Sequence, residues 1–142
     1  MKMVGVVVVI LALAGCASSN AFPVFDEEAT EADVLPSYLS ADEFPYDMSS
    51  VRFVGSRNET DFYLLKTEPD GGVCLALAAG PTNSMVACGG NGGIGTGAST
   101  QTTTACIVAA GTELEPGWAA VSDNVWVRDP SLGKKDQDSV CP

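Results

Sequence analysis

The sequence predicts a mainly β domain: a small antiparallel β-sandwich or partly closed barrel of about seven short strands, with one short N-terminal helix and two disulfides. Three observations predict it. Short apolar segments recur from Val51 onward, turn residues separate them, and four of the five cysteines lie between residues 74 and 141. The expected strands are residues 51–55, 62–67, 73–78, 85–88, 103–109, 118–121 and 125–128.

Residues 1–15 are typical of a lipoprotein signal peptide. Lys2 precedes an apolar run over residues 4–13, which is well short of the roughly twenty residues that span a bilayer. The tetrapeptide Leu13-Ala14-Gly15-Cys16 resembles the bacterial lipobox, in which the cysteine takes a diacylglycerol and becomes the mature N-terminus. We therefore expect a lipid anchor on Cys16, with membrane as the first partner and the outer face of the cytoplasmic membrane as the location.

The next segment, residues 16–48, is expected to form an acidic tether ahead of a domain over residues 49–142. Between residues 17 and 47 there are eight acids and no base, within a formal net charge of −11, so nucleic acid is excluded as a partner. Residues 17–20 and 40–50 are interpreted as solvated spacer. Asp26 as a cap and Pro36 as a stop predict a short helix near 26–35, with Phe25, Val34 and Leu35 free to dock on the domain.

The pairing of the cysteines follows from the register of an expected β-hairpin. A turn centred on Pro81 places Leu77 opposite Met85 and Cys74 opposite Cys88, within the distance that a disulfide bridges. Four cysteines allow three connectivities. We favour Cys74 with Cys88, which leaves Cys106 with Cys141 to hold a polar C-terminal tail. The chain has no histidine and no CxxC pair, so neither a metal site nor a redox dithiol is expected.

Short motifs along the chain resemble small lipoproteins of high-GC Gram-positive (actinobacterial) bacteria. They are Ala32-Asp33-Val34-Leu35-Pro36, Ser50-Val51-Arg52-Phe53-Val54-Gly55, Val73-Cys74-Leu75, Val86-Ala87-Cys88-Gly89, Gly117-Trp118 and Val125-Trp126-Val127. The resemblance implies export and lipid anchoring, and it carries over no functional residue. A Gly-rich insert at residues 89–97 departs from the pattern.

Two motif matches point to chemistry that their context does not support. Residues 90–95 satisfy GxGxxG, but a Gly, Ser and Thr run follows where a phosphate-binding helix would open, so a flexible loop and no cofactor are expected. Ser131 and Lys134 match SxxK, and Ser122-Asp123-Asn124 matches SDN. Their order is the reverse of that in penicillin-binding enzymes, and no KTG follows. Residues 122–124 are instead expected to form the turn of the last hairpin.

The sequence contains three other groups of candidate functional residues. Two acids, Asp136 and Asp138, lack the loop of a calcium site. Trp118 and Trp126 are expected in the core. The candidate carboxylates for glycoside hydrolysis fall near expected turns, where a solvated acid is the ordinary outcome: Asp61, Glu68, Asp70, Glu113 and Glu115.

No catalytic residue set assembles, so no enzyme is expected. The expected function is a non-catalytic, membrane-anchored protein of the cell envelope, a protein-interaction or surface module that contacts another envelope protein or simply occupies the surface. The alternative is a small-ligand binding domain with a pocket near the Gly-rich loop and Trp118.

Overall fold

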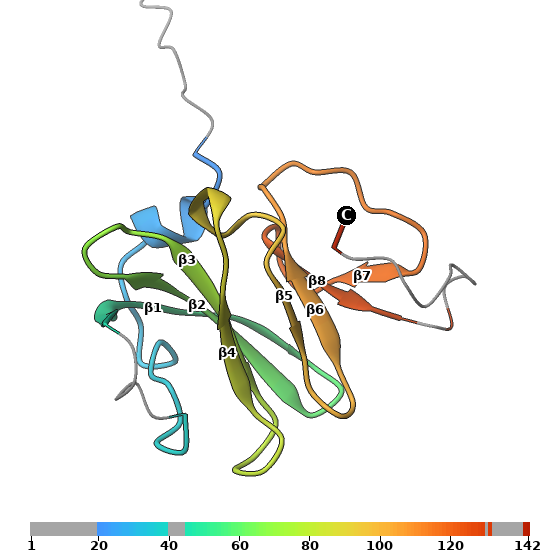
Figure 1. The fold of residues 1–142 in the computed structure, drawn as a ribbon, viewed down its shortest axis with the longest axis horizontal. Helices are drawn as coiled ribbons and strands as arrows, with labels where there is room; N and C mark the ends of the chain where they lie inside the picture. Colours follow the sequence, from blue (N-terminus) through green and yellow to red (C-terminus); the bar gives the residue numbers. More distant parts are fainter. Residues whose placement is uncertain (1–19, 40–44, 130, 132–140) are drawn as a thin grey trace, which may run out of the picture.

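The computed structural model describes residues 20–39, 45–129, 131 and 141–142. It contains two four-stranded antiparallel sheets (Figure 1). The first has the order β1-β2-β3-β4, with β1 (Tyr46–Arg57), β2 (Thr60–Thr67), β3 (Val73–Ala78) and β4 (Met85–Cys88). The second has the order β5-β6-β8-β7, with β5 (Gly97–Ser99), β6 (Thr104–Ile107), β7 (Trp118–Ala120) and β8 (Val125–Arg128). The mainly β fold class is thus confirmed.

All seven expected strands are present, and β5 is an additional one. Ala98 of β5 pairs with Ala105 of β6, and its side chain is buried in the core between the sheets. A Cβ on Gly97 would lie 2.9 Å from Sγ of Cys141, so this strand packs closely against the second disulfide. Its small residues explain why the sequence carries no apolar signal for it.

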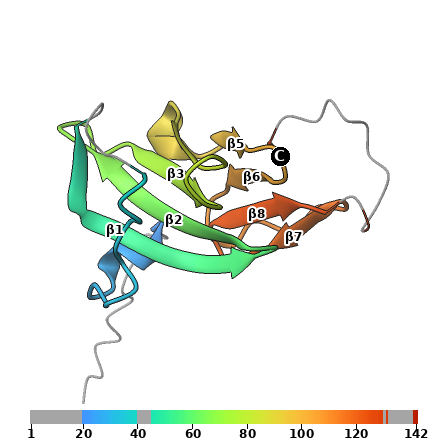
Figure 2. The same cartoon turned by 90° about the horizontal axis from the view of Figure 1, so that it is seen from below.

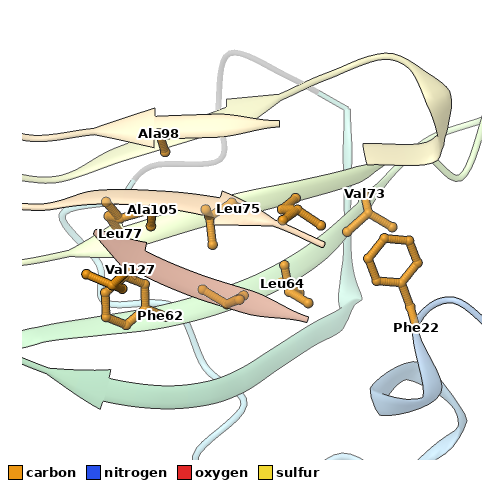
Figure 3. Packing of buried hydrophobic residues seen from close by; sticks show 11 residues of the cluster. Phe22, Phe62, Leu64, Val73, Leu75, Leu77, Ala98, Ala105 and Val127 are labelled. Atoms are coloured by element: carbon orange, nitrogen blue, oxygen red, sulfur yellow. The ribbon is translucent and has the colours of Figure 1, made fainter. Parts of the chain in front are cut away.

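The main core lies between the two sheets. Alternate residues of β2 and β3 point inward, including Phe62, Leu64 and Leu75, and they meet Ile107 and Val127 of the second sheet (Figure 3). Every second residue is therefore available for the outer faces. Both outer faces are also covered, since Leu35 and Leu39 pack over the first sheet, and Cys141 packs over the second.

The two sheets also meet at their sides. β4 contacts β5 along one side, where the chain passes through the 3-10 turn η2 (Asn91–Gly93). On the other side, an ion pair of 2.6 Å joins Arg57, the last residue of β1, to Asp129, which follows β8. The sandwich is consequently closed at both sides by contacts between the sheets.

Both expected disulfides are formed. Cys74 lies opposite Cys88 and Leu77 opposite Met85 in the β3–β4 ladder, which confirms the hairpin register. The Cα atoms are 4.3 Å apart in Cys74–Cys88 and 5.6 Å apart in Cys106–Cys141. The first bond cross-links neighbouring strands, whereas the second ties the end of the chain to β6.

The short helix expected near 26–35 is wrong. A 3-10 turn, η1 (Pro23–Asp26), ends where that helix was to begin, and residues 27–35 form turns and extended chain. Asp26 accepts a hydrogen bond from the Asn20 amide, 2.7 Å away, where a helix cap was expected. Tertiary packing decides this, because Phe22 enters the core between the sheets while Leu35 lies on the opposite face of the first sheet. Turns and extended chain over residues 27–35 connect these two positions.

The N-terminal segment is consequently part of the domain. It runs beside β1 (Figure 2), and Phe22, Leu35 and Leu39 are buried. Phe25 and Leu35 dock as expected, but Val34 is 67% exposed and does not. The domain therefore begins well before residue 49, and residues 46–50, expected as spacer, belong to β1.

Candidate functional site

A surface cavity of about 220 Å³ opens where three segments distant in sequence meet. They are the η1 region, the middle of β1, and the turn between β7 and β8. Small-molecule sites commonly measure about 300–1,000 Å³, so this cavity matches a single chemical group or one long side chain. Its lining residues are Pro23, Val24, Glu27, Phe53, Val54, Ser122, Asp123 and Asn124.

An irregularity in β1 shapes the wall of the cavity. The β1–β2 register shifts between Phe53 and Gly55, so Val54 has no partner on β2. Val54 packs against the main core and Phe53 packs with Tyr63 on the outer face, and both residues line the cavity at this bulge. The next residue, Gly55, has a φ of +144°, and a Cβ there would lie 2.7 Å from Cγ1 of Val121. Glycine thus permits the β7–β8 turn to approach β1 closely.

The β7–β8 turn supplies the opposite wall. The Ser122 hydroxyl oxygen accepts hydrogen bonds from the main-chain N–H groups of Asn124 and Val125, at 3.2 and 3.1 Å. Asn124 is 2% exposed, and its amide donates to the carbonyl oxygens of Ala21 at 2.7 Å and Val108 at 2.9 Å. Asn124 therefore holds the N-terminal segment against the last hairpin. The sequence Ser122-Asp123-Asn124 forms the hairpin turn, as expected.

The cavity has an acidic rim. Glu27 and Asp123 are exposed, and no lysine or arginine is among the lining residues. The nearby guanidinium of Arg52 donates from Nη2 to the main-chain oxygen of Glu27 at 3.1 Å, and from Nη1 to the main-chain oxygens of Ser49 and Val51. Because these contacts are to main-chain carbonyls, the Glu27 carboxylate remains available to a cation from outside.

Asp33 anchors the N-terminal segment to β1 beside the cavity. Its carboxylate accepts hydrogen bonds of 2.6 Å from the N–H groups of Phe53 and Thr30. Burial acts to raise the pKa of Asp33, but these N–H groups, the Thr30 hydroxyl and the charge of Arg52 together lower it. The ionised carboxylate therefore satisfies a main-chain donor on the outer edge of β1, at the residue that walls the cavity.

Of the SxxK match, the structure describes Ser131, which lies in a local turn. The N–H of Ser131 donates to Oδ1 of Asp129 at 3.0 Å, and its hydroxyl donates to the same oxygen. These two bonds lower the pKa of Asp129, and the paired Arg57 lowers it further. Lys134 lies outside the described residues. Ser131 thus engages a carboxylate that is itself paired with an arginine.

The Gly-rich loop is packed, which corrects the expectation of a flexible loop. The N–H groups of Gly93, Gly95 and Thr96 donate to main-chain oxygens of Gly90, Ile107 and Gly93. A Cβ on Gly93 would lie 2.4 Å from the carbonyl oxygen of Val73, so the loop lies directly on β3. These amides are consequently not available to a phosphate, and strand β5 follows the loop in place of a helix.

Trp118 and Trp126 are in the core, as expected, at 5% and 2% exposure. They pack with Cys106 and Val108 on the outer face of the second sheet, and the Arg128 guanidinium lies 5.6 Å from the centroid of the Trp118 ring. Neither Trp118 nor the Gly-rich loop lines the cavity between η1, β1 and the β7–β8 turn, so the pocket expected near them stays a prediction.

The other carboxylates are dispersed. Asp61 accepts a hydrogen bond from the Ser56 hydroxyl on the neighbouring strand. Glu68 and Asp70 are exposed between β2 and β3, and Glu113 and Glu115 are exposed ahead of β7. Across the part of the chain that the structure describes, no three His, Cys, Asp or Glu residues gather at a site that could hold a metal ion. Asp136 and Asp138 lie outside that part.

Sequence reasoning did not single out the cavity. Two local signals mark it in retrospect, a glycine inside the apolar run of β1 and the turn sequence that contains Asn124. The contribution of Glu27 has no local signal, because it depends on where the N-terminal segment docks.

The two disulfides indicate an extracytoplasmic protein. Cys16 lies outside the described residues, and within the described ranges no helix is long and apolar enough to cross a membrane. No family model, curated protein or solved structure matches the chain. The fold and its bonds define the class as a disulfide-stapled extracytoplasmic β domain, and any function is inferred from the chain's own residues.

Proposed function

We propose that this chain is a lipid-anchored protein of the cell envelope that acts by binding another envelope protein, without a catalytic step. The lipobox-like Leu13-Ala14-Gly15-Cys16 supports the anchor, and the disulfides agree with an oxidising compartment. The resemblance to small actinobacterial lipoproteins, which implies export and lipid anchoring, supports the same proposal.

One observation carries the non-catalytic part of the proposal: the hydroxyls of both serine motifs are held in local turns. The Ser122 oxygen accepts two main-chain N–H groups, and the Ser131 hydroxyl donates to Asp129. An acyl-transfer serine instead needs a base within hydrogen-bond reach that takes its proton. A carboxylate paired with Arg57 is a poor base for this purpose, because its pKa is lowered.

The position of the N-terminus would place the domain close to the membrane. Only three residues separate Cys16 from Asn20, so the two Cα atoms are at most about 14 Å apart in an extended chain. In Figure 1 the described chain begins at the end of the domain that carries η1 and η2, and the turn between β3 and β4 lies at the opposite end. A lipid on Cys16 would therefore orient the η1 end toward the membrane and the β3–β4 turn away from it.

The alternative, a small-ligand binding domain, is favoured by the cavity alone. Its volume of about 220 Å³ lies below the usual range for small-molecule sites, and its mouth carries two exposed carboxylates. A partner that inserts one group fits this cavity better than an enclosed small molecule does.

The anchor is tested by mass spectrometry of the membrane fraction. The N-terminal peptide should begin at Cys16 and carry a diacylglyceryl group, and Cys16→Ser should remain unprocessed. A soluble mature chain that begins elsewhere, without lipid, would refute the anchoring proposal.

The mode of action is tested on the anchored protein with a photo-crosslinking residue placed in turn at Asp123 and at Thr82. These positions lie at the cavity rim and in the β3–β4 turn. A discrete adduct with one envelope protein supports the proposal. Labelling of the protein by a fluorescent penicillin, lost in Ser131→Ala, would overturn it.

A further inference from the structure

We propose that the cavity between η1, β1 and the β7–β8 turn receives an arginine side chain of the partner protein. This inference rests on the proposed function and names the part of the partner that the site recognises. In protein interfaces, a few residues that fill well-formed pockets carry most of the binding energy, and arginine is prominent among them.

The cavity has the dimensions of one long side chain. Its volume is about 220 Å³, and its walls come from three separate segments that are fixed before binding. The buried amide of Asn124 ties the β7–β8 turn to the N-terminal segment at Ala21, while Gly55 lets β1 lie close to Val121 of the same turn. A preformed pocket of this kind loses little freedom on binding, which favours affinity.

The lining is amphipathic in the way that an arginine side chain is. Val24, Val54 and Phe53 are apolar lining residues against which a methylene stem can pack. Glu27 and Asp123 add two carboxylates, which bind a guanidinium through charge-assisted hydrogen bonds. A neutral or acidic group would leave these carboxylates without a counter-charge.

Arg52 and Lys66, the chain's own bases near the cavity, do not line it. Arg52 donates to main-chain oxygens of Glu27, Ser49 and Val51. The ammonium of Lys66 lies 4.6 Å from the centroid of the Phe25 ring. The described N-terminal segment, residues 20–39, contains five acids and no base, so its field attracts a basic partner.

The test uses the exported chain in detergent micelles and follows its amide signals by NMR. The first probe is Nα-acetyl-arginine methylamide, and the matched neutral probe is Nα-acetyl-citrulline methylamide, which has nearly the same shape. The arginine probe should shift the amide signals of Phe53, Val54 and Asn124 saturably, and the citrulline probe should bind about tenfold or more weakly.

Two double variants identify the acids that matter. Glu27→Gln with Asp123→Asn should weaken the arginine probe by about tenfold or more, because both rim charges are removed. Glu59→Gln with Asp70→Asn makes the same change of charge at two exposed acids away from the cavity and should leave binding within about twofold. Equal binding of the citrulline probe, unchanged binding by the rim variant, or shifts confined to other residues would overturn the proposal.

A third comparison separates a protein partner from a free metabolite. A Gly-Gly-Arg-Gly-Gly peptide, blocked at both ends, should bind at least as tightly as free arginine, whose own carboxylate is repelled by the rim. Much tighter binding of free arginine would overturn the assignment to a protein side chain. Acylation of Cys16 and crosslinking from Thr82 do not depend on this cavity, so failure here is distinguishable from failure of the proposed function.

Discussion

Replacing Phe22 by alanine tests whether the N-terminal segment is an integral part of the domain. The Phe22 side chain is 8% exposed and lies in the main core cluster with Leu64 and Val73 (Figure 3). The centroids of the Phe22 and Phe25 rings are 6.1 Å apart. Phe→Ala changes in protein cores cost about 3–5 kcal/mol. Phe22 lies at the margin of the core, where neighbours can partly close the space, so we expect a loss of about 3 kcal/mol in the free energy of unfolding.

The measurement is urea unfolding followed by fluorescence of the buried Trp118 and Trp126, which report loss of the second sheet. Val34→Ala is the matched control, because Val34 belongs to the same segment and is exposed, and its effect should be within about 0.5 kcal/mol. If Phe22→Ala costs no more than this control, the segment is a spacer and its packing as described here is refuted.

Three further predictions follow from the bonds and close contacts. Replacing both Cys106 and Cys141 by serine should lower the free energy of unfolding by about 4 kcal/mol, because this disulfide closes a loop of 35 residues. Replacing both Cys74 and Cys88 by serine should lower it by about 3 kcal/mol, because the loop is 14 residues long. Urea midpoints in the opposite order would contradict this prediction. Gly55→Ala should destabilise the fold by about 2 kcal/mol or more, since the new Cβ meets Val121 at an unfavourable φ, whereas Gly90→Ala, where a Cβ meets nothing, should be nearly neutral in thermal unfolding. Asp33→Asn should be less stable than the parent at pH 7. Because the pKa of Asp33 is lowered in the fold, its stabilising contribution is lost as the pH falls below about 4, and the gap between parent and variant should narrow there; a gap that does not depend on pH would contradict the charged hydrogen bonds.

The strands and the first disulfide could be predicted from the sequence because their signals are local. Apolar runs between turn residues mark β2, β3 and β4, and the length of the β3–β4 turn determines which residues face each other. Cys74 and Cys88 follow from that register, and Cys106 and Cys141 then follow as the remaining pair. The short strand β5 was not predicted, since Gly97, Ala98 and Ser99 lack apolar periodicity and their pairing depends on β6.

The N-terminal segment shows where local reasoning fails. Asp26, Glu27 and Glu28 before an apolar pair suit a helix, but the segment gains more by burying Phe22 on one side of the first sheet and Leu35 on the other. Helix propensity differs by less than about 1 kcal/mol per residue, whereas burying one large apolar side chain contributes about 1.5–3 kcal/mol. Packing therefore overrides the helical pattern.

The sequence by itself determined the β class of the domain and the pairing of its cysteines, because each depends on residues close together in the chain or on simple counting. The export signal ahead of Cys16 stays a prediction from the sequence. The tertiary structure alone decided that residues 20–39 belong to the domain and that Glu27, Phe53 and Asp123 meet around one cavity. These three residues come from segments with no local relation. The bulge at Val54, the close approach at Gly55 and the buried amide of Asn124 bring them together. Such contacts between distant segments leave no periodic trace in a single sequence, and for this reason the candidate site is visible only in the folded molecule.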